Sequence, residues 1–169
     1  MKKQKGFSLI ELLIVVAIIL IIAAIAIPNL LKAKMAANES SAAGAIRTIN
    51  TAQVSYATLF PQQGYAAGLT NLGGPAVACA PPALSTIAQA CLIDELLSVA
   101  PFNKSGYTYV VNGVAVAGAP ALPVLAYFST GTPLSIGTSG QNQFCSDQSG
   151  VVRHDPTGAG CNVASLALQ

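Results

Sequence analysis

The most constraining feature of the sequence is an apolar stretch near its beginning, GFSLIELLIVVAIILIIAAIAI, which runs from Gly6 to Ile27. A short basic leader, MKKQK, precedes it, and Glu11 is the one charge inside it. As a helix from Phe7 to Ile27, the stretch would rise roughly 30 Å at about 1.5 Å per residue, which matches the hydrocarbon thickness of a bilayer. It is therefore predicted to span a membrane.

A secretory signal peptide would also begin with lysines and an apolar core, but a small-residue cleavage site and a loop would follow that core. The alanines between residues 23 and 26 imitate such a site. The residues from Pro28 onward, however, lead into a long alanine-rich helical pattern. The sequence therefore favours a helix that is retained in the mature protein.

Residues 5–12, KGFSLIEL, are followed by the apolar run and by Pro28, and this combination resembles the N-terminus of type IV prepilins and of the related pseudopilins of type II secretion. The motif joins a leader, a glycine before an aromatic residue, a carboxylate five residues after that glycine and a long apolar helix. In that family a prepilin peptidase cuts after the glycine and methylates the new amino terminus. The resemblance implies a cut between Gly6 and Phe7.

Glu11 is costly in a membrane, because a charge inside a spanning helix costs about 2.5 to 3.5 kcal/mol on insertion scales, and it therefore normally marks function. After cleavage, Phe7 would carry a cationic amino terminus about one helical turn from Glu11. The two charges could pair within one chain. Alternatively, Glu11 could meet the Phe7 amine of a neighbouring subunit and set the axial register of a filament. A third interpretation is a tolerated polar residue that snorkels to water.

Charge is scarce in this chain, with 8% charged residues and a formal net charge of +2. Removal of the three leader lysines gives +2 − 3 = −1 before the termini are counted. This balance does not provide the basic surface that general nucleic-acid binding requires, so nucleic acid is not predicted as a general ligand. An exterior built of small and uncharged residues suits a surface that packs against copies of itself.

The sequence predicts four segments: a leader over residues 1–6, a transmembrane or filament-core helix over 7–28, an amphipathic helix over 29–60 and one globular head over 61–169. Pro28 predicts a bend or a locally melted turn. Beyond it, apolar residues recur at three-, four- and seven-residue steps, while polar residues such as Asn50 and Gln53 are expected on other faces. The recurring apolar positions are Leu31, Met35, Ala42, Ile46, Ile49, Ala52, Tyr56 and Leu59.

Gly44 lies inside the predicted amphipathic helix and weakens it by up to about 1 kcal/mol relative to alanine. Close packing against the head is the favoured explanation, and a hinge is the alternative. Pro61 ends the helix, and residues 62–82 are predicted to form an irregular loop. A short helix is predicted between residues 85 and 99.

The rest of the head is predicted to form an antiparallel sheet of about four strands. Asn112-Gly113 between two apolar runs, 107–111 and 114–117, predicts a two-residue hairpin turn. Further strands are expected within residues 122–130, 143–146 and 151–154. Packing of this sheet on the amphipathic helix gives an α+β fold, type IV pilin-like in layout.

Four cysteines in a head that would lie outside the cytoplasm predict two disulfides. Of the three possible connectivities, Cys79–Cys91 with Cys145–Cys161 is the simplest, because each pair closes a short local loop. In many pilins a C-terminal disulfide encloses a surface loop, and Cys145–Cys161 would match that layout. A zinc site is disfavoured, since the chain contains no Cys-x-x-Cys pair and a single histidine.

No catalytic constellation is evident. Asp94 and Glu95 are adjacent and would project in different directions from a helix, which makes solvent-facing charge the better explanation. His154 next to Asp155 does not make a triad by adjacency alone, and a surface position at a strand end is expected. Asp147 and Asp155 alone are weak evidence for a calcium site, because calcium takes six to eight oxygen ligands.

The sequence therefore predicts a structural protein without enzymatic activity, cofactor or metal. The resemblance implies a homopolymeric filament subunit that is held in the inner membrane with its head outside the cytoplasm before assembly, and lies in a surface filament afterwards. Its implied partners are copies of itself, a prepilin peptidase and an assembly machinery with a separate ATPase, because the chain has no glycine-rich phosphate loop. Alternatives are a pseudopilin of type II secretion and a minor tip subunit for adhesion or DNA uptake.

Overall fold

The structure, a computed structural model, describes residues 8–81, 84–115, 123–158 and 160–168. It divides into two compact units, Met1–Lys34 and Met35–Gln169, which are described separately below. Helix α1, Leu9–Leu59, contributes to both units. The expected leader, with Gly6 and Phe7, lies outside the described residues.

The described part of the first unit is helical from Leu9 onward. A bend or a locally melted turn was predicted near Pro28. The helix continues through this residue, so the melted turn is wrong, and the bend stays a prediction. Proline supplies no backbone donor, but a helix tolerates this loss where the surrounding residues are strong helix formers such as leucine, alanine and lysine.

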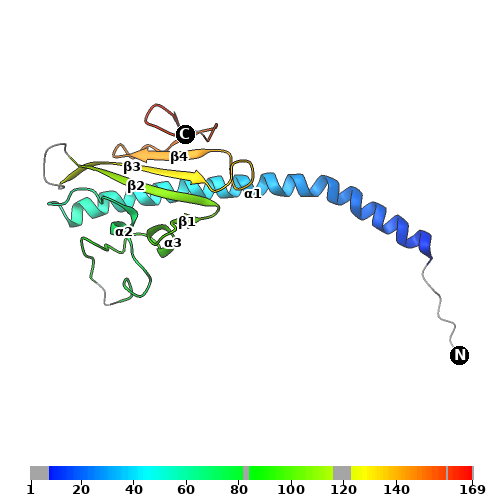
Figure 1. The fold of residues 1–169 in the computed structure, drawn as a ribbon, viewed down its shortest axis with the longest axis horizontal. Helices are drawn as coiled ribbons and strands as arrows, with labels where there is room; N and C mark the ends of the chain where they lie inside the picture. Colours follow the sequence, from blue (N-terminus) through cyan, green and yellow to red (C-terminus); the bar gives the residue numbers. More distant parts are fainter. Residues whose placement is uncertain (1–7, 82–83, 116–122, 159, 169) are drawn as a thin grey trace. The chain divides into compact units, whose positions relative to one another are not determined.

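In the second unit, the residues of α1 from Ala42 to Tyr56 pack on an antiparallel sheet, as predicted (Figure 1). The sheet has the order β1-β2-β3-β4-β5-β6, in which every strand pairs with its sequence neighbour. It contains six strands rather than about four, because two very short edge strands flank the predicted ones. The strands are β1 Asn103–Lys104, β2 Tyr107–Ala115, β3 Val124–Pro133, β4 Gln143–Asp147, β5 Arg153–Asp155 and β6 Leu166–Ala167.

Strand β2 corrects the predicted hairpin, because Asn112 and Gly113 lie in the middle of one continuous strand. They pair with Phe128 and Tyr127 of β3. Gly113 is needed for close approach: a Cβ there would lie 2.8 Å from the Cα of Ala67. The Asn-Gly pair is typical of turns, but here its glycine serves close packing, because a glycine in a strand also permits a neighbouring backbone to come close.

The core lies between α1 and the inner face of the sheet, and most of the predicted α1 stripe is buried in it. Leu31 and Leu59 are exceptions, with exposures of 51% each. The larger correction concerns Asn50 and Gln53, which were expected on polar faces but are 8% and 0% exposed. Both side chains are buried because hydrogen bonds within the core satisfy their amide groups.

Asn50 joins α1 to the sheet: its Nδ2 donates to Ser146 Oγ at 2.8 Å and its Oδ1 accepts from the Tyr127 hydroxyl at 3.1 Å. Gln53 joins α1 to the following loop, because its Oε1 accepts from the Ala66 N–H at 2.8 Å and its Nε2 donates to the Ala66 carbonyl at 3.2 Å. These contacts fix the rotation of the helix against the head, since buried polar groups require partners.

The described part of the head contains two short helices, of which one was predicted. Helix α2, Leu69–Leu72, falls in the stretch expected to be irregular, and α3, Glu95–Ser98, is the only helical part of residues 85–99. The N–H groups of Ala90 and Leu92 donate to Asn71 and Leu72, so they are unavailable for helix formation. Gly44 also differs from expectation, because a Cβ at that position would meet nothing within 4 Å.

Candidate functional site

The beginning of α1 carries the side chain that the sequence singles out. The backbone N–H of Ser8 donates to Glu11 Oε2 at 2.8 Å, and the Leu12 N–H donates to the Ser8 carbonyl at 3.3 Å. Ser8 immediately precedes the helix, so Ser8 and Glu11 occupy the N-cap and third helical positions. This is the glutamate half of a capping box, in which a carboxylate satisfies an N–H that the helix leaves unpaired.

The capping contact was missed in the sequence, although its signal, Ser-x-x-Glu before an apolar run, stands in residues 8–11. The charge of Glu11 instead predicted a pairing with the Phe7 amine of the same chain or of a neighbour. A carboxylate in the first turn also interacts favourably with the positive end of the helix dipole. Glu11 therefore has a structural partner within its own chain.

The large apolar side chains of α1 between Leu9 and Leu31 lie at the surface, with exposures from 47% to 79%. They surround the helix rather than forming one stripe, which is the pattern of a helix that is buried on all sides by other molecules. An 18-residue window of α1 has a mean hydropathy of 3.3, and none of that window is buried. By length and composition, α1 can cross a membrane. The exposed residues are Leu9, Ile10, Leu12, Leu13, Ile14, Val15, Val16, Ile18, Ile19, Leu20, Ile21, Ile22, Ile25, Ile27, Leu30 and Leu31.

Burial of such a surface releases a large free energy, because each large apolar side chain contributes about 1.5 to 3 kcal/mol when it leaves water. Summed over this part of α1, the gain amounts to tens of kcal/mol. Lipid chains or the apolar faces of other helices can provide that burial.

Residues 1–27 match the family model described as the prokaryotic N-terminal methylation motif. The chain carries a prepilin-type methylation motif. The match places Gly6, Phe7 and Glu11 in the same segment that the sequence pattern indicated.

Two curated proteins are similar to parts of this chain. One is a type IV major pilin protein, PilA, of Myxococcus xanthus, with 50% identity over 54 residues, which cover 32% of this chain and 24% of that protein. The other is a type IV wide pilus major component, PilA4, of Thermus thermophilus, with 62% identity over 40 residues, which cover 24% of this chain and 30% of that protein. The chain thus matches about a quarter to a third of these relatives. No solved structure matches it.

The head contains both disulfides of the simplest connectivity. Cys79–Cys91 and Cys145–Cys161 have Cα–Cα distances of 5.5 Å and 5.7 Å. The first closes the loop between α2 and α3, and the second ties β4 to the C-terminal segment. Each bridge constrains the unfolded chain and thereby stabilises the head.

Asp94 forms an ion pair with Lys104, whose Nζ lies 2.8 Å from its Oδ2. The two side chains are 43% and 33% exposed, so the pair contributes at most about 1 kcal/mol to stability. Glu95 begins α3 and is exposed. The two adjacent acids therefore do not form a paired-carboxylate site.

His154 lies in β5 and lines a groove of about 370 Å³ with Glu39 and Arg47. Its Nδ1 is buried and has no hydrogen-bond partner among the described residues. The carboxylate of Asp155 accepts hydrogen bonds from Thr157 and from the Gly160 N–H. A hydrolytic triad is therefore not assembled at this histidine.

The two aspartates considered for calcium serve as turn acceptors instead. Asp147 Oδ1 accepts from the N–H of Ser149 at 2.9 Å, and Asp155 has the equivalent contact with Thr157 at 3.0 Å. Asp147 ends β4 and Asp155 ends β5. Within residues 8–168, where described, no group of three or more histidine, cysteine, aspartate or glutamate side chains gathers to hold a metal.

Three buried tyrosines of the sheet have raised pKa values. Burial raises the pKa of Tyr127 to about 12, with smaller contributions from Tyr65 and Asp147. Burial likewise raises the pKa of Tyr107 and of Tyr109 far above the ordinary value. These hydroxyls stay protonated in the folded head, and they form part of its core rather than an acid–base site.

Proposed function

We propose that this chain is the structural subunit of a type IV pilus-like filament. In this proposal it is held in the inner membrane by α1, with its head outside the cytoplasm. A prepilin peptidase cuts between Gly6 and Phe7 and methylates the new amino terminus, and subunits then polymerise through α1. The observation that carries the proposal is the joint presence of the methylation motif and an apolar helix surface that is exposed on all sides.

In this proposal, assembly transfers the apolar surface of α1 from lipid to neighbouring helices. In the membrane, lipid covers the first half of α1, and in a filament the same side chains pack against neighbouring helices. Lipid and helix surface are similarly apolar, so polar contacts and close packing decide between the two states. A machinery with its own ATPase would supply the work of extraction, and Pro28 would let the helix adjust as it leaves the membrane.

Glu11 is the polar group that can make the filament specific. In low dielectric, the attraction between its carboxylate and the Phe7 amine of a neighbouring subunit would be strong, and the pairing would set the axial register. The capping contact with Ser8 allows a sharp test, because glutamine at this position also completes a capping box. Glu11→Gln therefore removes the charge while keeping the cap.

The test measures filaments and processing together. Surface material sheared from cells is imaged by electron microscopy, and the mature N-terminus is determined by mass spectrometry. We expect filaments whose chains begin with methylated Phe7. Recovery of the chain only as a membrane monomer would refute the filament proposal, whereas short, cell-bound fibres would support the pseudopilin alternative.

The Glu11→Gln variant is expected to be processed and inserted normally but to yield few filaments. Glu95→Gln is the matched control, because it removes an exposed carboxylate of the head. If Glu11→Gln assembled as well as the control, charge pairing would not set the register, and capping would be the main role of Glu11.

A further inference from the structure

The outer edge of β2 is only partly covered. The N–H of Tyr109 donates to the carbonyl of Phe102 at 3.0 Å, and the N–H of Gly113 donates to the carbonyl of Ala67 at 3.0 Å. Along an antiparallel strand, the backbone groups of alternate residues point to the same edge. Val111, midway between these two residues, therefore directs its N–H and C=O to this edge and away from β3.

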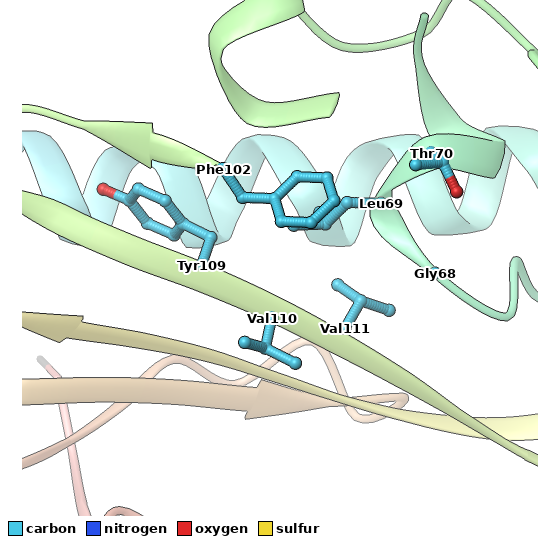
Figure 2. Close-up of a pocket in the computed structure, with 7 residues that line it drawn as sticks. All are labelled: Gly68, Leu69, Thr70, Phe102, Tyr109, Val110 and Val111. Carbon is cyan, nitrogen blue, oxygen red and sulfur yellow. The ribbon is translucent and has the colours of Figure 1, made fainter. Parts of the chain in front are cut away.

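No described residue provides a hydrogen-bond partner for these two groups of Val111. Val111 is nevertheless 6% exposed, and buried backbone donors in folded proteins are almost always paired. The gap opens into a cleft of about 210 Å³ (Figure 2). The cleft is lined by Gly68, Leu69, Thr70, Phe102, Tyr109, Val110 and Val111.

The cleft has an apolar wall. In Figure 2 the ring of Phe102 and the side chain of Leu69 lie together on the side opposite Val111. Phe102 has a φ of 58°, in the left-handed region that bulky residues rarely adopt. Such strain persists where the surrounding structure enforces it, and it occurs often at ligand clamps. None of the described residues that line the cleft carries a charged side chain.

The same chain shows how such a pair of groups is satisfied. The N–H and C=O of Ala66 are both bonded by one carboxamide, that of Gln53. A primary carboxamide thus complements the donor and acceptor of one residue, and in an extended peptide the N–H and C=O of one residue do the same. Val111 lacks this complement, while the strand edges on both sides of it are covered by Phe102 and Ala67.

We propose that this cleft, which we call the Val111 cleft, binds a short, uncharged, extended peptide segment of a partner. The N–H and C=O of one partner residue pair with the C=O and N–H of Val111, and one apolar side chain of the partner packs against Leu69 and Phe102. This mode is addition of a strand to an exposed sheet edge. It goes beyond the proposed filament function and does not depend on it.

The dimensions of the Val111 cleft and of the strand edge limit the size of the ligand. A cleft of about 210 Å³ is smaller than the roughly 300 to 1,000 Å³ of typical small-molecule and cofactor sites. The edge between Tyr109 and Gly113 measures about 14 Å at roughly 3.4 Å per residue, and the covering segments occupy both ends of it. The pairing therefore involves one or two residues of the partner, and one side chain fills the cleft.

Hydrogen exchange at the Val111 amide tests the pairing directly. The full chain, labelled with ¹⁵N-valine, is studied in detergent micelles. The probes are pools of acetylated, amidated hexapeptides of serine, threonine and glycine, with leucine, phenylalanine or lysine fixed at the third position. Without peptide, we expect fast exchange at Val111. The leucine and phenylalanine pools at about millimolar concentration should slow it about tenfold, and the lysine pool should not.

Two controls separate strand pairing from simple hydration. N-methylation of the third residue of the peptide removes the donor and should abolish the effect. Gly68→Leu should also abolish the effect, because Gly68 lines the cleft and the leucine side chain would occupy it. The head should tolerate this substitution, because Gly68 has an extended backbone with a φ of −157° and a Cβ there would have no neighbour closer than 3.8 Å. Gly160→Leu is the matched control, since a Cβ there meets nothing within 4 Å.

The proposal is overturned if no pool slows exchange at Val111, which would indicate an edge that is hydrated only. It is also overturned if the N-methylated peptides or the Gly68→Leu chain respond as strongly as the unmodified ones. Neither outcome bears on filament formation, so failure here is distinct from failure of the proposed function.

Discussion

The substitution Gln53→Met tests whether the buried amide of α1 holds the helix against the head. Gln53 and Ala66 are both 0% exposed, and two hydrogen bonds join them, at 2.8 Å and 3.2 Å. Methionine has a similar length but can make neither bond. The variant would therefore leave the N–H and the C=O of Ala66 buried and unsatisfied.

Each unsatisfied buried group costs about 1 to 3 kcal/mol, which gives roughly 2 to 6 kcal/mol for the pair. Burial of a thioether in place of an amide offsets part of this cost, so we expect a net loss of about 3 kcal/mol. For a head of this size the loss corresponds to a decrease in Tm of roughly 10 °C. The assay is thermal unfolding of the full chain in detergent, followed by the near-ultraviolet circular dichroism of its tyrosines.

Gln62→Met serves as the control, because it makes the same chemical change at an exposed position just beyond α1. A surface change of this kind is expected to alter stability by no more than about 0.5 kcal/mol. If the two variants melted at the same temperature, the reasoning that Gln53 fixes the helix through Ala66 would be refuted.

Three further predictions concern the head, each measured by unfolding of the full chain. Gly113→Ala should destabilise it by about 1 to 3 kcal/mol through the clash with the neighbouring loop, whereas Gly44→Ala, with free space around its Cβ, should stabilise it by up to about 1 kcal/mol. Because burial raises the pKa of Tyr127 to about 12, the unfolded chain loses this proton first. The contribution of Tyr127 to stability should be constant below about pH 10 and should fall by about 1.4 kcal/mol per pH unit between about pH 10 and pH 12. Replacement of Cys145 and Cys161 by alanine should cost about 2 to 4 kcal/mol.

The α+β layout could be predicted because its signals are local. The apolar run, the helical periodicity from Ala42 to Tyr56 and the alternation in β3 each depend on neighbours in sequence. Burial along β3 alternates from Tyr127 to Pro133, as a half-buried strand requires. The two edge strands were missed, because two-residue strands carry too little pattern to detect.

The errors arose where a distant residue changed the role of a local signal. Asn50 and Gln53 look like solvent-facing residues by composition, yet partners 96 and 13 positions away satisfy them in the core. Asn112-Gly113 has the composition of a turn, but Gly113 serves the close approach of Ala67. Such roles depend on tertiary packing, which one sequence does not reveal.

If subunits assemble through Glu11, as we propose, the capping contact of this residue limits how its carboxylate can meet a neighbouring chain. In the single chain the carboxylate already accepts the Ser8 N–H at 2.8 Å, which satisfies one of the N–H groups left unpaired at the start of the helix. If the Phe7 amine of a neighbour binds the Glu11 carboxylate, the hydrogen bond to Ser8 is exchanged for a charge pair. Alternatively, the second carboxylate oxygen makes the new contact while Oε2 keeps the hydrogen bond to Ser8. Because two charges attract strongly in a low dielectric, either route favours assembly once water is excluded. Exposed in water, the same pair would be screened, so the selectivity of Glu11 depends on the apolar surface that surrounds it.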